Sequence, residues 1–220
     1  MWTLALFCVM PGSLATIAGP VNAPPSQPSA GFDCGTDVSL DFEARACSTG
    51  SPLQNNLGGH GPDSGTPELR YGQVGELNGQ PFDLVITNTT EYHPKDGTGK
   101  TGCRGAFGQI NVQLGWDTGF RMQLRDSGTD ALVAVPGFHF SVFDLDGRQG
   151  SKYAEKLVVE GYEEYSVSAP TNVILGQYVG GRPTSFRAFS WYGSHSSCLR
   201  RKNRFWNSSM ATKSSASTTL

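Results

Sequence analysis

The sequence predicts an all-β protein, an antiparallel β-sandwich of jelly-roll type. Short stretches alternate apolar and polar residues along much of the chain. Turn-forming residues separate these stretches, with 28 Gly and 13 Pro among 220 residues, and no long window has the 3.6-residue period of a helix. Alternation with one polar face is typical of antiparallel sheets that pack on one side, and two such sheets face to face give a sandwich.

The predicted strands follow one another along the chain. The clearest is the segment 119–126, in which Phe120, Met122 and Leu124 face one side and charged or amide residues face the other. Loops rich in turn residues separate it from the other predicted strands. The other predicted strands are residues 39–46, 81–87, 108–116, 131–135, 138–145, 155–162, 171–179 and 185–193. We therefore expect no helix longer than about three turns within residues 36–190.

The chain is expected to divide into four parts. Residues 1–18 have the pattern of a signal peptide, with an apolar run too short to span a bilayer and small residues after it. Residues 19–33 are rich in Pro and predict a flexible linker. Residues 34–198 are expected to form the β-sandwich domain, and residues 199–220 a basic and then Ser/Thr-rich tail. A buried strand or a truncated gene model is the alternative for the first segment.

Cysteine usage indicates an oxidising compartment. The chain has five cysteines, and removal of Cys8 with the leader leaves Cys34, Cys47, Cys103 and Cys198. An even number without zinc-finger spacing favours disulfides, and four free thiols in a cytosolic protein are the alternative. Because Cys34 and Cys47 lie at opposite ends of one predicted strand, we expect each to pair with Cys103 or Cys198.

Two further features agree with an extracellular location. N-glycosylation motifs begin at Asn88 and Asn207. The formal net charge of -2 gives no bulk attraction to nucleic acid or to anionic membranes. After the leader, no stretch is long and apolar enough for a transmembrane helix. We therefore expect an extracellular glycan or protein as partner, with no nucleic acid and no membrane span.

The segment 138–148, FHFSVFDLDGR, suggests a metal site. Three apolar residues share one face of the predicted strand, and Asp144 and Asp146 continue that face. Two bare carboxylates are costly in an apolar core, so they are expected at the end of the sheet with a partner. With Cα atoms about 6.6 Å apart, both can reach one Ca²⁺. The alternative is that both accept backbone N–H groups at a turn or pair with Arg148.

A second stretch rich in oxygen ligands is residues 54–65, QNNLGGHGPDSG. It carries the amide oxygens of Asn55 and Asn56 and the carboxylate of Asp63, and its glycines expose backbone carbonyls. This is the set of oxygens that a hard cation such as Ca²⁺ prefers. The alternative is a Gly-rich loop with no ligand.

The order of NNLGGHGPD, LRYGQVG, PFDLVIT, FGQINVQLG and FHFSVFDLD resembles a group of secreted, β-rich, largely uncharacterised modules of unicellular eukaryotes. The resemblance covers roughly residues 54–190 and implies an extracellular β-sandwich module. It implies no activity. Beyond residue 190 the acidic loop and final strand of that group are not matched.

Aromatic residues near predicted strand ends are candidate ligand contacts. Tyr92 lies in a long predicted loop, Trp116 ends one predicted strand, and Trp191 and Tyr192 end another. Loops at the ends of a sandwich commonly carry binding sites. Flat rings beside Asp and Asn suit a sugar. The alternative is that Trp116 and Trp191 pack in the core, as large aromatic residues usually do.

The sequence thus predicts a secreted, non-enzymatic β-sandwich module, stabilised by Ca²⁺, that recognises extracellular carbohydrate or protein. A secreted jelly-roll enzyme acting on polysaccharides is one alternative. Its only candidate carboxylates would be Asp144, Asp146 and Glu163 or Glu164. A purely structural cell-surface domain is the other alternative.

Overall fold

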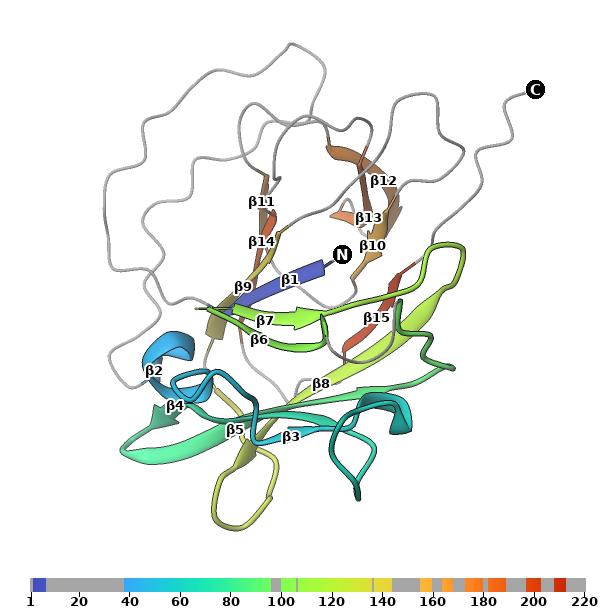
Figure 1. Ribbon diagram of the computed structural model, residues 1–220. Helices are drawn as coiled ribbons and strands as arrows, with labels where there is room; N and C mark the ends of the chain where they lie inside the picture. Colours follow the sequence, from blue (N-terminus) through green and yellow to red (C-terminus); the bar gives the residue numbers. More distant parts are fainter. Residues whose placement is uncertain are drawn as a thin grey trace, which may run out of the picture.

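The computed structural model describes residues 2–6, 38–95, 100–105, 107–135, 137–143, 155–159, 164–167, 173–179, 182–188, 197–202 and 208–212. Within these ranges the chain is rich in β-strand (Figure 1). Every strand pairing there is antiparallel. Its helical elements there are a five-residue π-helix, η1 (Phe42–Ala46), and a three-residue 3₁₀ turn, η2 (Leu57–Gly59). The predicted all-β, antiparallel class is therefore confirmed.

The larger sheet has nine strands. Its order is β12 (Val173–Val179), β13 (Arg182–Ala188), β10 (Lys156–Val158), β15 (Ser208–Thr212), β8 (Thr118–Asp126), β5 (Gln80–Asn88), β4 (Leu69–Leu77) and β2 (Val38–Leu40), with β3 (Gln54–Asn55) also paired to β4. The smaller sheet has six strands. Its order is β11 (Glu164–Val167), β14 (Ser197–Lys202), β9 (Gly137–Phe143), β1 (Trp2–Leu6), β7 (Phe107–Ile110) and β6 (Gly102–Arg104).

The core follows the alternation of the sequence. In β8, Phe120, Met122 and Leu124 are buried, and the residues between them lie on the opposite face. Met122 and Leu124 stand opposite Ile86 and Leu84 of β5, so their side chains share the apolar face of this sheet. One hydrophobic cluster joins these residues to the buried residues of β9 in the other sheet, which are Phe138, Phe140 and Val142.

The strand predicted over residues 39–46 is wrong after Leu40. The chain leaves β2 and forms η1, whose first turn is fixed by the Asp41 carboxylate, which accepts the N–H of Ala44 at 2.9 Å. The Arg45 guanidinium then reaches back to Glu76 of β4 at 3.0 Å. A short polar side chain that can bond its own backbone thus overrides the alternating pattern.

Three other predicted strands are shorter than expected. The strand predicted over 155–162 ends at Val158, since Val159 lies outside β10. The strand predicted over 108–116 ends at Ile110, because the following residues turn toward the loop that carries His93. The segment 131–135 makes only an isolated bridge, between Leu132 and Arg125.

Several strands were not predicted. β4 contains Gly72 and Gly75, and it is interrupted by a bulge at which Gln73 has φ 47°, so its alternation is broken. The strand β15 and the part of β14 from residue 199 onward lie where the sequence predicts a tail, and β1 lies within the predicted leader, paired with β7 and β9.

Candidate functional site

The ring of Trp116 is an exposed apolar feature of the loop between β7 and β8. Its side chain is 47% exposed, and its ring stacks on that of His93, with centroids 3.7 Å apart and planes inclined at 31°. The neighbouring Leu114 is also exposed. Trp116 therefore does not pack in the core, and the ring of His93 lies against its indole.

Backbone hydrogen bonds hold this loop in place. The N–H of Gln113 donates to the carbonyl of His93 at 2.8 Å, and the N–H of Trp116 donates to the carbonyl of Gln113 at 3.3 Å. The carboxylate of Glu91 lies 3.5 Å from Nε2 of His93, and its side chain is 79% exposed. We call Glu91, His93, Leu114 and Trp116 the indole platform.

Tyr92, between Glu91 and His93 in the chain, is buried. Its hydroxyl donates to the carbonyl of Asn111 at 2.7 Å and shares a hydrogen bond of 2.8 Å with the hydroxyl of Thr101. Its ring meets Phe120 edge to face at 5.9 Å. Burial raises the pKa of Tyr92 to about 12, although these two hydrogen bonds lower it. Tyr92 therefore anchors the loop, and its hydroxyl is not available to a ligand at the surface.

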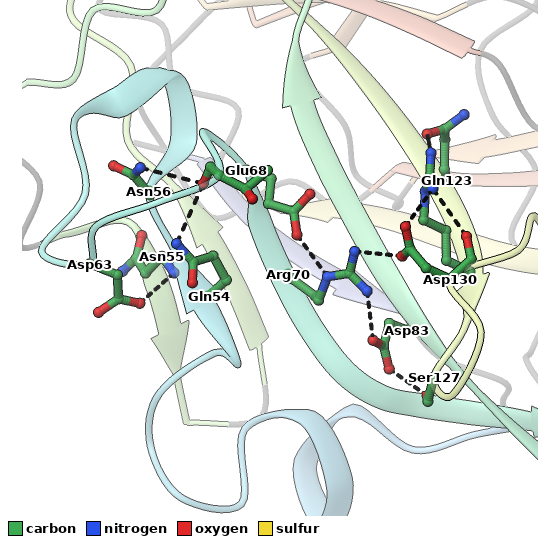
Figure 2. Close-up of polar contacts among 12 residues, drawn as sticks. Gln54, Asn55, Asn56, Asp63, Glu68, Arg70, Asp83, Gln123, Ser127 and Asp130 are labelled. Carbon is green, nitrogen blue, oxygen red and sulfur yellow. Dashed lines mark hydrogen bonds and ion pairs between the residues drawn. The ribbon is translucent and has the colours of Figure 1, made fainter.

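The loop after β3 brings Asn55, Asn56 and Asp63 together (Figure 2). Asp63 accepts the N–H of Asn55 at 2.7 Å, and the amide oxygen of Asn56 accepts the N–H of Gly61 at 3.2 Å. The amide nitrogen of Asn55 donates to the carbonyl of Thr101 at 2.7 Å. The two asparagines and Asp63 thus close the loop through hydrogen bonds.

One oxygen of this loop is left without a hydrogen bond. Oδ1 of Asn55 is buried and has no hydrogen-bond partner among the described residues. The exposed Asp63 retains a second carboxylate oxygen. Within the same ranges, no group of three or more His, Cys, Asp or Glu side chains is placed to hold a metal ion. The other proposed ligands, Asp144 and Asp146, lie outside the described residues.

A cluster of charged side chains covers the outer face of β4, β5 and β8 (Figure 2). The guanidinium of Arg70 contacts Glu68 at 2.7 Å, Asp83 at 3.0 Å and Asp130 at 2.7 Å. Burial opposes the charge of Arg70, but the hydrogen bonds to these carboxylates outweigh it and raise its pKa. The hydrogen bond from Arg70 also lowers the pKa of Asp130.

Asp83 is the buried member of this cluster, with 3% of its side chain exposed. Its carboxylate also accepts the N–H of Gln73 at 2.8 Å and the hydroxyl of Ser127. It therefore ties the bulge of β4 to the turn after β8. We interpret the cluster as structural, because Arg70 is already surrounded by carboxylates.

A disulfide joins Cys47 to Cys103, with Cα atoms 5.6 Å apart. It links the residue after η1 to β6, and Cys103 is one of the two partners that the sequence leaves open for Cys47. Cys198 lies in β14, opposite Ser141 of β9. Cys34 is outside the described residues.

Some of the remaining predicted residues lie within the described ranges, and others lie outside them. Asn88 ends β5, and its amide nitrogen donates to the carbonyl of Thr90 at 2.8 Å. Glu164 begins β11. Outside the described residues lie Glu163, Trp191, Tyr192 and Asn207.

Sequence reasoning missed His93 and the Arg70 cluster. His93 is one of four scattered histidines, and nothing in its spacing connects it to Trp116. Arg70 and Asp83 were missed because β4 was not predicted as a strand. The signal that could reveal the pair is the alternation of Arg70 with the buried Leu69 and Tyr71, which places Arg70 on the outward face, where it contacts Asp83 of β5.

Comparisons with protein families, with curated proteins and with solved structures give no match for this chain. Within the described ranges, no helix is long and apolar enough to cross a membrane. The indole platform and the loop that carries Asn55 are the candidate functional sites among the described residues.

Proposed function

We propose that this chain is a secreted, non-enzymatic β-sandwich module that recognises extracellular carbohydrate or protein through the indole platform. The observation that carries the proposal is the exposed Trp116 ring stacked on His93. Tryptophan, which combines an apolar ring with a polar N–H, is one of the residue types enriched at binding hot spots. Because the loop is already held by backbone hydrogen bonds, little ordering is needed when a ligand binds.

Carbohydrate is the ligand class that the platform suits best. The apolar C–H face of a sugar ring can stack on the indole of Trp116, while the exposed carboxylate of Glu91 can accept hydroxyl hydrogen bonds. Leu114 extends the apolar surface beside the ring. A protein partner would use the same residues, with an apolar side chain in place of the sugar.

The sandwich arrangement belongs to the same proposal. One hydrophobic cluster draws on both sheets, which supports two sheets packed face to face with loops at the ends. The disulfide between Cys47 and Cys103 supports an oxidising environment, as a secreted protein would meet. Ca²⁺ is proposed as a stabilising ion, held by Asp144 and Asp146 with Asn55, Asn56 and Asp63.

Two other functions compete with this proposal. A secreted jelly-roll enzyme acting on polysaccharides would need a pair of acidic residues, for which Asp144, Asp146 and Glu163 or Glu164 are the candidates. A structural surface domain would bind no ligand through Trp116. Measured turnover of soluble polysaccharides would favour the enzyme. The absence of any ligand that depends on Trp116 would favour the structural domain.

A glycan array tests the proposal. The full-length protein is screened beside Trp116→Ala and beside Leu132→Ala, since Leu132 is similarly exposed, at 44%, but contacts β8 outside the platform. We expect the wild type and Leu132→Ala to bind the same glycans and Trp116→Ala to lose them. Equal binding by all three proteins would contradict a role for the platform.

A further inference from the structure

The hairpin that joins β4 to β5 ends in a two-residue turn. Leu77 pairs with Gln80, so Asn78 and Gly79 form the tip. Both have positive φ, 52° for Asn78 and 76° for Gly79, as a type I′ turn requires. Both residues are exposed, and apart from its two chain neighbours nothing lies within 4 Å of the place where a Cβ on Gly79 would stand. The backbone N–H of Gly79, the residue after Asn78, is therefore open to solvent.

We propose that Asn78 is a site of spontaneous deamidation, with water as the only co-reactant. The backbone nitrogen of Gly79 loses its proton to solvent base and attacks Cγ of Asn78. The Cγ–Nδ2 bond breaks, ammonia leaves, and a five-membered succinimide forms. Water then adds to one of the two ring carbonyls. Opening at Cγ gives aspartate, whereas opening at the main-chain carbonyl of residue 78 gives isoaspartate.

The sequence and the structure single out this asparagine. Asn78-Gly79 is the one Asn-Gly pair in the chain, and glycine presents no side chain that would hinder the attack. The other described asparagines differ in that each uses its amide nitrogen to donate to a backbone carbonyl. They are Asn55, Asn56, Asn88 and Asn111.

The product alters the hairpin. Isoaspartate routes the chain through the former side chain and adds a carbon atom to the turn. The pairing of Leu77 with Gln80 depends on a turn of two normal residues, so its geometry cannot be kept. Because β4 and β5 carry Arg70 and Asp83, weakening their pairing also loosens the outer cluster. We expect the isoaspartate form to melt at a lower temperature than the unmodified protein.

The test is peptide mapping of the folded, disulfide-bonded, full-length protein after incubation in mildly alkaline buffer, with a zero-time sample as reference. We expect the Asn78 peptide to gain aspartate and isoaspartate, with isoaspartate in excess, faster than the peptides of the other described asparagines. Asn78→Gly keeps the positive φ and has no amide to lose, so its matching peptide should stay unchanged.

Two results would overturn the proposal. One is an Asn78 peptide that converts no faster than the Asn88 peptide in the folded protein. The other is conversion of Asn78 that appears only after the protein has been denatured, which would mean that the folded turn protects it.

Discussion

The centroid of the Trp116 ring lies 3.7 Å from the centroid of the His93 ring, although the two residues belong to different loops. The N–H of Gln113 donates to the carbonyl of His93, which ties the two loops together beside the stacked rings. Tyr92, the residue before His93, is anchored in the interior by Thr101 and Asn111. A buried polar contact thus fixes the position of an exposed aromatic ring, which is the arrangement that a preorganised binding surface needs.

The buried carboxylate of Asp83 should matter more to stability than the exposed carboxylate of Asp130, although both contact Arg70. Asp83→Asn removes the charge that Arg70 meets in a buried position, and we expect a loss of about 3 kcal/mol in the free energy of unfolding. Asp130 is 55% exposed, so Asp130→Asn should cost less than about 1 kcal/mol. Urea denaturation of both variants measures the difference. Equal losses would mean that burial does not govern this cluster.

The disulfide should contribute strongly to stability. Its cysteines are separated by 56 positions, and closing a loop of that length reduces the entropy of the unfolded chain. Replacing both Cys47 and Cys103 by Ser should lower the free energy of unfolding by up to about 4 kcal/mol. The measurement is chemical denaturation of the variant beside the wild type without reductant. An unchanged midpoint would show that the crosslink constrains little.

The raised pKa of Tyr92 predicts alkaline destabilisation. Unfolded tyrosine ionises near pH 10, whereas burial raises the pKa of Tyr92 to about 12 in the folded state. The folded protein therefore holds this proton more tightly, and stability is lost as pH rises from about 10 toward 12. Thermal melts across this range should show a steeper fall for wild type than for Tyr92→Phe. Parallel curves would assign the fall to other groups, such as Tyr71, whose pKa burial also raises.

Calcium should stabilise the domain if Asp144 and Asp146 close one end of it. With a dissociation constant near 0.1 mM, about 10 mM Ca²⁺ contributes about 2.7 kcal/mol. For a domain of this size that raises Tm by roughly 5–10 °C. Melts in Ca²⁺ and in EDTA, for wild type and for Asp144→Asn, measure the effect. Identical Tm values in all four samples would contradict the calcium site and favour the alternative that both aspartates accept backbone N–H groups at a turn.

Strands with unbroken alternation could be predicted from the sequence. Residues 119–126 and 81–87 became β8 and β5, because each places a continuous apolar row on the core. β4 escaped prediction because its bulge at Gln73 shifts the register. The residues after Leu40 have a good alternating pattern but form η1, since Asp41 bonds the backbone of Ala44.

The sequence predicts single residues of the candidate site but not how they come together. Trp116 stands out in the sequence as a large aromatic residue near a loop, but its exposure depends on where the chain turns after β7. The partnership with His93 depends on tertiary contact, which no spacing in the sequence encodes. Tyr92 is also an aromatic residue near a predicted loop, so the sequence does not distinguish it from Trp116. In the structure, however, its hydroxyl has buried partners and its side chain faces inward.

The central claim is that ligand binding depends on the indole platform, and a calorimetric titration tests it most directly. The best glycan from the array, or the protein partner if no glycan binds, is titrated into wild type, Trp116→Ala and Leu132→Ala. Removal of a stacked aromatic anchor typically costs 2 kcal/mol or more, about a thirtyfold weaker Kd. We predict that weakening for Trp116→Ala alone, with Tm of all three proteins within a few degrees. An unchanged Kd for Trp116→Ala would contradict the account.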